Sequence, residues 1–445
     1  MDTKPNREPL EVVIVGGSLS GLMCGIALKH AGHTVTILEK HGNERQSHMA
    51  GVCLGPDAKT FLERHDGFDR VFHHRSYQVQ ALKNDETVQV FVKAHRNVTS
   101  WDTLYFRLRS CFDGYVSSYY PSPPHPREMD GTVMYEYQKE VLDIERTSDD
   151  GRMSLSVLNR KTDELSHQKA DLIIGADGPD SFIRAKYLPD VGRKYVGYIA
   201  WRGTVPEAEV SDETRELLKS SVTLYMMHRQ HCILYMIPGV DGALEPGCRL
   251  MNFLWYTNET PEALEDIMID GIDGHRHHNI VPAGRVREDV WKARLEYAKK
   301  APLPGPFLEV ITNIRRPFIQ VITDVRSPQA AFEDGRVLLV GDALSLYRPH
   351  TAFSATQAAF HALMVEDYLA GKISLQKWEE NVLRYSDLHS SQSILYGSFY
   401  QSNAAVVLLA GFRYLAHCCI DRLKSWWNGK KPLLRSTVQG GQDGL

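Results

Sequence analysis

A strand, a glycine-rich turn and a helix follow one another near the start of the chain, and this order constrains the fold more than any other feature. Residues 12–15 are a short run of β-branched residues, typical of a strand buried on both faces of a parallel sheet. The sequence GGSLSG follows at once and leads into a stretch with helical spacing that ends at Gly32. Residues 34–38 form the next strand-like run. Together these segments predict a βαβ unit.

The glycine turn and the end of the second strand carry the groups that a dinucleotide needs. Gly16, Gly17, Ser18 and Gly21 allow the backbone to approach a pyrophosphate, whose charge the helix N-terminal amides stabilise. Ser18 replaces the middle glycine of the strict motif. Glu39 is placed to accept hydrogen bonds from the 2′-hydroxyl of an unphosphorylated adenosine ribose. A tight turn that binds no nucleotide, and a merely solvated Glu39, are the alternatives.

Two later segments, residues 171–178 and 336–343, repeat the pattern of a buried strand followed by a turn with glycine and aspartate. Between them, residues 198–204, 221–237 and 249–257 form longer runs rich in Tyr, Trp, Met and Val, which are typical of antiparallel strands. The nucleotide-type segments are therefore interrupted by a second sheet. This arrangement indicates interleaved domains.

With these motifs the chain resembles the FAD-dependent aromatic-hydroxylase class of flavoprotein monooxygenases, which have the p-hydroxybenzoate hydroxylase fold. Within that class it is most similar to the dihydroxypyridine-hydroxylase-like and fungal members. The motifs are GGSLSG with Glu39, GADGPDSFIR and VGDALSLYRPHTAFSATQAA. The FAD-binding residues that the resemblance implies beyond the first turn and Glu39 are Lys40, Gly51, Arg109, Asp177, Gly178, Arg184, Gly341 and Asp342. For two of them there are alternatives to FAD binding: Asp342 could cap the next helix, and Arg109 could lie on the surface.

The resemblance implies an α/β fold, in which a Rossmann-like FAD-binding domain is interleaved with an antiparallel-sheet substrate domain and followed by C-terminal helices. FAD-binding segments are expected at 8–75, 166–190 and 326–395, and the substrate-binding sheet at 191–325. The stretch 76–165 is expected to mix substrate-side strands with a helix that contacts FAD. C-terminal helices are expected at 396–434 and a tail at 435–445.

The resemblance also implies the reaction. No second glycine-rich dinucleotide motif occurs in the chain, so NAD(P)H is expected as a transient co-substrate that reduces FAD and leaves. O2 then forms a C4a-(hydro)peroxyflavin, which hydroxylates or epoxidises an aromatic, heteroaromatic or other electron-rich substrate, secondary metabolites included. An FAD-dependent oxidase or dehydrogenase on the same fold, and a flavin-free relative that binds a partner, are the alternative functions.

Candidate substrate contacts lie after the third motif and on the predicted antiparallel strands. Arg348 and His350 are candidate catalytic residues that would orient an anionic or phenolic substrate, with His350 as a base near neutral pH. A structural role in the loop is the alternative for both residues. The strand residues that could line the pocket, if they are not ordinary core, are Tyr225, Tyr235, Trp255 and Trp201.

The stretch Ala352, Phe353, Ser354 departs from the glycine pattern of the family. Its methyl and benzyl groups are expected to crowd the approach of the backbone to the flavin ring. Ser345 stands where many members have histidine. Both departures bear on the geometry at the flavin edge.

Composition excludes several other classes of protein. With 51 Lys and Arg against 55 Asp and Glu, and no long basic tract, the chain is not expected to bind nucleic acid. Its seven cysteines include no CxxC pair, so neither a disulfide framework nor a metal site is expected. A reducing, cytoplasmic location is the simplest reading.

One apolar segment near the C-terminus bears on that location. Residues 404–420 are strongly apolar but are interrupted by Arg413 and His417, which disfavours a full transmembrane helix. A packed C-terminal helix is the first interpretation. A helix lying on a membrane surface, aided by Trp426 and Trp427, is the second.

Overall fold

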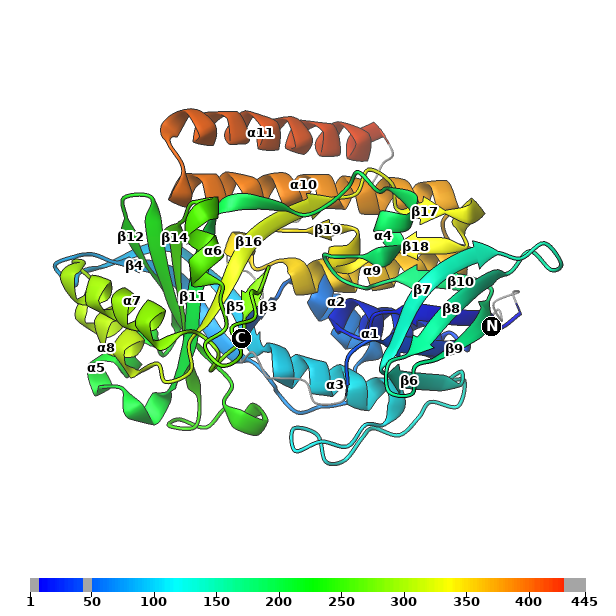
Figure 1. The fold of residues 1–445 in the computed structure, drawn as a ribbon, viewed down its shortest axis with the longest axis horizontal. Helices are drawn as coiled ribbons and strands as arrows, with labels where there is room; N and C mark the ends of the chain where they lie inside the picture. Colours follow the sequence, from blue (N-terminus) through cyan, green and yellow to red (C-terminus); the bar gives the residue numbers. More distant parts are fainter. Residues whose placement is uncertain (1–7, 43–49, 428–445) are drawn as a thin grey trace.

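The computed structural model describes residues 8–42 and 50–427, and two sheets lie side by side in it (Figure 1). The smaller, nucleotide-type sheet has the strand order β17-β18-β10-β1-β2-β6. Its central pairs are parallel, with β1 between β10 and β2, and only the edge strand β17 is antiparallel. Its strands are β1 (Glu11–Val15), β2 (Thr34–Glu39), β6 (Val133–Tyr137), β10 (Leu172–Gly175), β17 (Ala331–Phe332) and β18 (Val337–Leu339). The predicted interleaved α/β fold is thereby confirmed.

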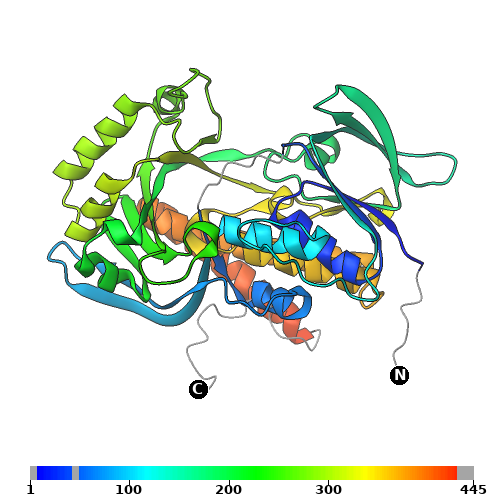
Figure 2. The same ribbon diagram turned by 90° about the horizontal axis from the view of Figure 1, so that it is seen from below.

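Helices cover one face of this sheet. Figure 2 shows α1, α3 and α9 side by side across the middle of the molecule. Gly25 makes close packing possible there, because a β-carbon at this position would lie 2.8 Å from the ring of Phe112 on α3. The helices on this face are α1 (Leu19–His30), α3 (Trp101–Asp113) and α9 (Ser354–Leu369), and α2 (Pro56–His65) packs on α9. The short helix α4 (Phe182–Tyr187) follows β10. A separate three-stranded sheet of β7 (Lys139–Arg146), β8 (Met153–Asn159) and β9 (Glu164–Ala170) lies at one end.

The larger sheet is mostly antiparallel, with the order β15-β16-β11-β14-β13-β12-β4-β5-β3. Its strands are β3 (Gly51–Leu54), β4 (His74–Leu82), β5 (Val88–Ser100), β11 (Lys194–Pro206), β12 (Ser221–Met227), β13 (Gln230–Ile237), β14 (Leu250–Asn258), β15 (Ile280–Val281) and β16 (Phe318–Arg326), with β19 (Ser345–Leu346) beside β16. The run 221–237 is thus two strands. Its tight turn places Arg229 in the left-handed region with φ 56°, and neither glycine nor proline marks that turn in the sequence.

One face of the larger sheet is covered by short helices. Trp201 and Trp255 stand opposite each other in register, and Tyr225 joins them on this face, where its ring is 5.9 Å from that of Phe307. The helices are α5 (Asp212–Leu218), α6 (Pro261–Ile267), α7 (Glu288–Lys300) and α8 (Gly305–Asn313). The other face is turned toward the nucleotide-type sheet.

Two long helices complete the chain. α10 (Leu375–Gln401) contacts α9 and the strands β13, β16 and β19, and α11 (Ala404–Trp427) packs along its outer side (Figure 1). α11 is long and apolar enough to cross a membrane, and its outer face exposes Leu408, Phe412 and Trp426. It packs on α10 as expected, while the membrane-surface contact stays a prediction. The tail expected at 435–445 lies outside the described residues.

Candidate active site

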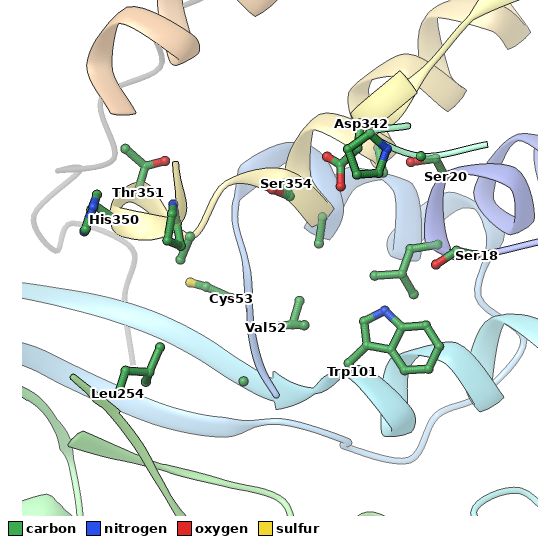
Figure 3. Close-up of a pocket in the computed structure, with 18 of the residues that line it drawn as sticks. Ser18, Ser20, Val52, Cys53, Trp101, Leu254, Asp342, His350, Thr351 and Ser354 are labelled. Carbon is green, nitrogen blue, oxygen red and sulfur yellow. The ribbon is translucent and has the colours of Figure 1, made fainter. Parts of the chain in front are cut away.

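A cavity of about 980 Å³ lies between the nucleotide-type sheet and the open face of the larger sheet (Figure 3). This volume is at the upper end of the roughly 300 to 1,000 Å³ typical of ligand pockets. One side is lined by the turns that follow β1, β2, β10 and β18, and the other by β11 to β14. The cavity therefore has a nucleotide-type half and a sheet half.

The glycine turn after β1 has a geometry that side chains would block. Gly16 has φ +103°, and a β-carbon there would overlap the carbonyl of Ala176. A β-carbon on Gly21 would overlap the carbonyl of Gly16. Gly16, Gly17 and Ser18 line the cavity, whereas Gly21 lies behind the turn. Since the first turn of α1 carries no acidic residue, its amides are free to stabilise an anion in the cavity.

Glu39 closes β2 at the cavity wall and is held in place by two backbone amides. Its Oε2 accepts a hydrogen bond from the Gly17 amide and its Oε1 one from the His41 amide, both at 3.0 Å. The residue is only 5% exposed, and Lys40 lines the cavity beside it. This is a fixed carboxylate of the kind that binds ribose hydroxyls.

Asp342 provides the sharpest test of whether FAD fits. It follows β18 in a short 3-10 turn (Gly341–Ala343), lines the cavity, and accepts no hydrogen bond from any residue that the structure describes. It caps no helix there, contrary to the alternative considered above. Burial raises the pKa of Asp342 to about 6, opposed in part by the charge of Arg193. An acceptor in the cavity wall without donors fits a ligand that brings hydroxyl groups.

The turn after β10 adds a second acceptor. Asp177 accepts a hydrogen bond from the Ile183 amide, in the first turn of α4, at 3.1 Å, while its buried Oδ1 has no partner among the described residues. Gly178, with φ +78°, has no atom within 4 Å of where a β-carbon would stand, so the backbone there is open to a ligand. Arg184 does not line the cavity. It donates to the carbonyls of Pro179, Val191 and Ala343 and so ties this turn to that of Asp342.

Arg109 does not contact the cavity, which corrects the expectation that it reaches FAD. Its side chain is buried behind the glycine turn, where it pairs with Asp113 at 2.7 Å. Its guanidinium lies 3.7 Å from the ring centroid of Tyr135, whose hydroxyl donates to the Gly17 carbonyl at 2.8 Å. Arg109 therefore supports the turn through Tyr135. Trp101, on the same helix, does line the cavity.

On the sheet side, strand alternation decides which aromatic residues face the cavity. Of the four candidates, only Tyr235 lines it. Tyr225, Trp201 and Trp255 point to the opposite face. Residues that pair across neighbouring strands have their side chains on the same side of a sheet, and the pairing places these three in the core beneath the short helices. The sheet residues that line the cavity are Arg202, Val222, Leu224, Met226, Ile233, Tyr235, Leu254 and Tyr256.

His350 lines the cavity in a 3-10 turn (Pro349–Thr351) before α9, but it is not a base near neutral pH. Burial, with a contribution from Arg348, lowers its pKa to about 3, so the ring is neutral at physiological pH. Its Nε2 lies 2.8 Å from the Tyr198 hydroxyl, and its Nδ1 has no partner among the described residues. Its ring packs 4.9 Å from that of Tyr256.

Arg348 lies outside the cavity lining and pairs with Asp324 at 2.9 Å. Its charge is therefore compensated, and the expectation that it orients the substrate directly is not supported by its position. It adjoins Tyr198 and His350 where α10 passes closest: a β-carbon on Gly397 would lie 2.7 to 3.1 Å from all three side chains.

The departure from the family pattern at the start of α9 is accommodated by the backbone. Ala352 lines the cavity in the left-handed region, with φ 51°, a conformation that costs about 1 kcal/mol for a residue other than glycine. Phe353 turns away, and its ring stacks 4.2 Å from that of His389 in the core. The expected crowding by the benzyl group is thus absent. Ser354 faces the cavity (Figure 3), and Ala355 also lines it. Ser345 is buried and does not line it.

Comparison with known proteins agrees with this geometry. A family model described as "FAD binding domain" matches residues 11–111, and one described as "FAD binding domain-like" matches residues 195–324. The chain is 27% identical to 2,6-dihydroxypyridine 3-monooxygenase of Paenarthrobacter nicotinovorans, over 84% of this chain and 87% of that protein. It is 20% identical to 6-hydroxynicotinate 3-monooxygenase of Bordetella bronchiseptica, over 80% and 81% of the two chains. The solved structure of 2,6-dihydroxypyridine-3-hydroxylase from Arthrobacter nicotinovorans matches with a TM-score of 0.75 at 24% identity, covering 88% of this chain and 93% of its own.

Proposed function

We propose that this chain, which belongs to the FAD-dependent flavoprotein monooxygenases of the aromatic-hydroxylase type, hydroxylates a heteroaromatic or phenolic ring with NAD(P)H and O2. The observation that carries the proposal is the single cavity with two unlike halves. One half offers fixed acceptors and helix amides suited to FAD, and the other a largely apolar, aromatic wall suited to a ring. The relatives named above act on hydroxylated pyridines, which favours that substrate class.

In this proposal each group at the nucleotide-type half has a distinct role. The amides of α1 hold the pyrophosphate, Glu39 the adenosine ribose and Asp342 the ribityl hydroxyls. Bound FAD supplies electrons, received from NAD(P)H, for the activation of O2 and the transfer of one oxygen atom to the ring. The amides at the start of α9 stabilise negative charge at the cavity wall beside Ser354.

The sheet half positions the ring and keeps water out. Leu224, Ile233 and Leu254 give it an apolar wall, and Tyr235 and Tyr256 add aromatic faces. His350 and Tyr198 are both neutral, since burial lowers the pKa of the imidazole and raises that of the phenol. They act as a hydrogen-bonding pair that orients a ring hydroxyl and passes its proton on, rather than as a titrating base.

The test is oxygenation under ¹⁸O2. Purified holoenzyme is supplied with NADH or NADPH and a panel of hydroxypyridines, hydroxybenzoates and indoles, and the products are analysed by mass spectrometry. We expect a product heavier by one labelled oxygen atom. Hydrogen peroxide with an unlabelled, desaturated product would instead indicate an oxidase, and a protein that cannot be loaded with FAD would contradict the proposal.

A further inference from the structure

We propose that a second cavity, of about 500 Å³, is the entrance through which the aromatic ring reaches the sheet half of the main cavity, and that Phe399 and Met226 form its gate. The inference rests on the proposed function, because it assigns a route to the same substrate. It makes these two side chains determinants of how fast a ring binds and how large that ring can be.

The second cavity lies where the end of α10 meets the turn between β12 and β13. It is lined by residues 226–230, 399, 400 and 402–404. Because His228, Arg229 and Asn403 are exposed, this cavity opens to solvent. Its volume is within the roughly 300 to 1,000 Å³ of ligand pockets, so a compound of one or two rings fits inside it.

Three side chains belong to the walls of both cavities, namely Met226, Phe399 and Tyr400. Phe399 is 61% exposed and Met226 is 41% exposed, so neither is held in place by a surrounding core. Exposed side chains change rotamer in picoseconds to nanoseconds, and methionine is unbranched and adaptable. Rotation of these two side chains would therefore join the cavities.

The backbone around this gate is fixed. Gln401 ends α10, and its carbonyl accepts hydrogen bonds from Asn258 at 3.0 Å and from Arg229 at 3.4 Å. Its side-chain nitrogen lies 3.0 Å from Nδ1 of the buried His231, on which the ring of Tyr400 stacks at 4.2 Å. The end of α10 is thus tied to β13, β14 and the turn after β12. Opening is therefore expected from side chains and not from movement of the helix.

The gate leads into the sheet half and away from the nucleotide-type half. Met226 lies on the same face of β12 as Leu224, which lines the sheet half, because residues two apart on a strand share a face. Tyr396 lines the main cavity one turn before Phe399 and Tyr400, and these three share one face of α10. A ring that enters here meets apolar and aromatic groups throughout. It reaches the sheet without passing the turns that hold FAD in the proposed function.

The test measures how fast ring compounds enter and leave FAD-loaded enzyme. Hydroxypyridines and the larger hydroxyquinolines are mixed with the enzyme in stopped flow, and the perturbation of the flavin absorbance gives kon, koff and Kd. Phe399→Trp narrows the passage, whereas Phe399→Ala and Met226→Ala widen it. Phe412→Trp, at a position on α11 that is 70% exposed and lines neither cavity, is the matched control. Phe91→Ala, at an exposed position that lines only the main cavity, tests for an entrance at β5 instead.

We expect Phe399→Trp to lower kon and koff by the same factor, about tenfold, and to leave Kd unchanged, because a gate alters the barrier and not the bound state. Phe399→Ala and Met226→Ala should raise both rates, and more for hydroxyquinolines than for hydroxypyridines. A side chain that only contacts the bound ring would instead change koff and therefore Kd.

A second experiment blocks the outer cavity itself. His228 lines the second cavity and not the main one, so a bulky maleimide on His228→Cys would obstruct entry without touching a bound ring. Wild-type enzyme treated with the same reagent controls for native thiols, of which Cys248 and Cys419 are exposed. The label should lower kon and koff together and leave Kd unchanged.

Unchanged rates in the Phe399 variants or in the labelled enzyme, or a change in Kd through koff alone, would overturn the entrance. So would a larger effect of Phe91→Ala on both rates. None of these results touches the proposed function, which the labelled oxygen of the product tests separately. FAD-loaded enzyme whose absorbance no ring compound perturbs would contradict both.

Discussion

Replacing Asp342 with Asn should raise the folding stability of the FAD-free protein and lower its affinity for FAD. The carboxylate lines the cavity without a hydrogen-bond donor, and burial raises its pKa from 3.8 to about 6. An acid whose pKa is higher in the folded state destabilises that state once it ionises. The loss of folding stability is therefore absent below about pH 4 and complete above about pH 6. Since the pKa shift is about 2 units, this loss is at most about 3 kcal/mol.

The same carboxylate is the acceptor assigned to the ribityl hydroxyls. Hydrogen bonds to a charged acceptor contribute about 1.5 to 3 kcal/mol each, so its loss should weaken FAD binding by about 10- to 100-fold. The assay is a pair of measurements on apoprotein: melting temperature at pH 5 and pH 8, and FAD affinity by fluorescence titration. Asp334→Asn, at a position whose side chain is 83% exposed, is the matched control. Unchanged FAD affinity in Asp342→Asn, or an apoprotein that melts no higher than wild type at pH 8, would refute the reasoning.

Three further predictions concern separate parts of the chain. His350→Gln should lower kcat without removing a limb from the pH profile between about pH 5.5 and 8, because the pKa of His350 is about 3; a limb near pH 6.5 that this variant abolishes would contradict the neutral role. Arg109→Met should cost about 3 to 5 kcal/mol of unfolding free energy by leaving Asp113 unpaired, yet its folded fraction should keep FAD, measured as the flavin-to-protein ratio. Leu408→Glu with Phe412→Glu should abolish sedimentation with phosphatidylserine vesicles if α11 lies on membranes, and identical behaviour of wild type and variant would exclude that contact.

The nucleotide-type half of the site could be predicted because its signals are local. Gly16 and Gly21 are required by overlaps with atoms a few residues away or in the adjoining strand. Glu39 is the last residue of β2 and Asp342 lies in the turn after β18, and the carboxyl ends of such parallel strands meet at one edge of the sheet. Residues more than 300 positions apart were thus expected at the same place from strand and turn patterns alone.

The sheet half could not be predicted, because it depends on register and burial. A tight turn at Arg229, without glycine, fixes the pairing of β12 with β13, and that pairing turns Tyr225 and Trp255 away from the cavity. The run that contains Trp201 also holds Arg202, one position further along, and only the register shows which of the two faces the cavity.

Burial changed the chemistry assigned to single residues as well. His350 reaches the cavity as expected, but the surroundings supplied by β11, β14 and α10 hold its pKa far below neutrality. Arg109 was expected to bind FAD, and the direction of its side chain is set instead by Asp113 and Tyr135. Neither outcome is encoded in the few residues around these positions.

A crystal structure of the holoenzyme with a hydroxylated heteroaromatic or phenolic compound would test the central claim most directly. The account predicts FAD density running from Glu39 past the start of α1 to Asp342, with the ring of the compound between the flavin ring and the larger sheet. Density for FAD elsewhere, or a ring compound bound outside this cavity, would contradict it.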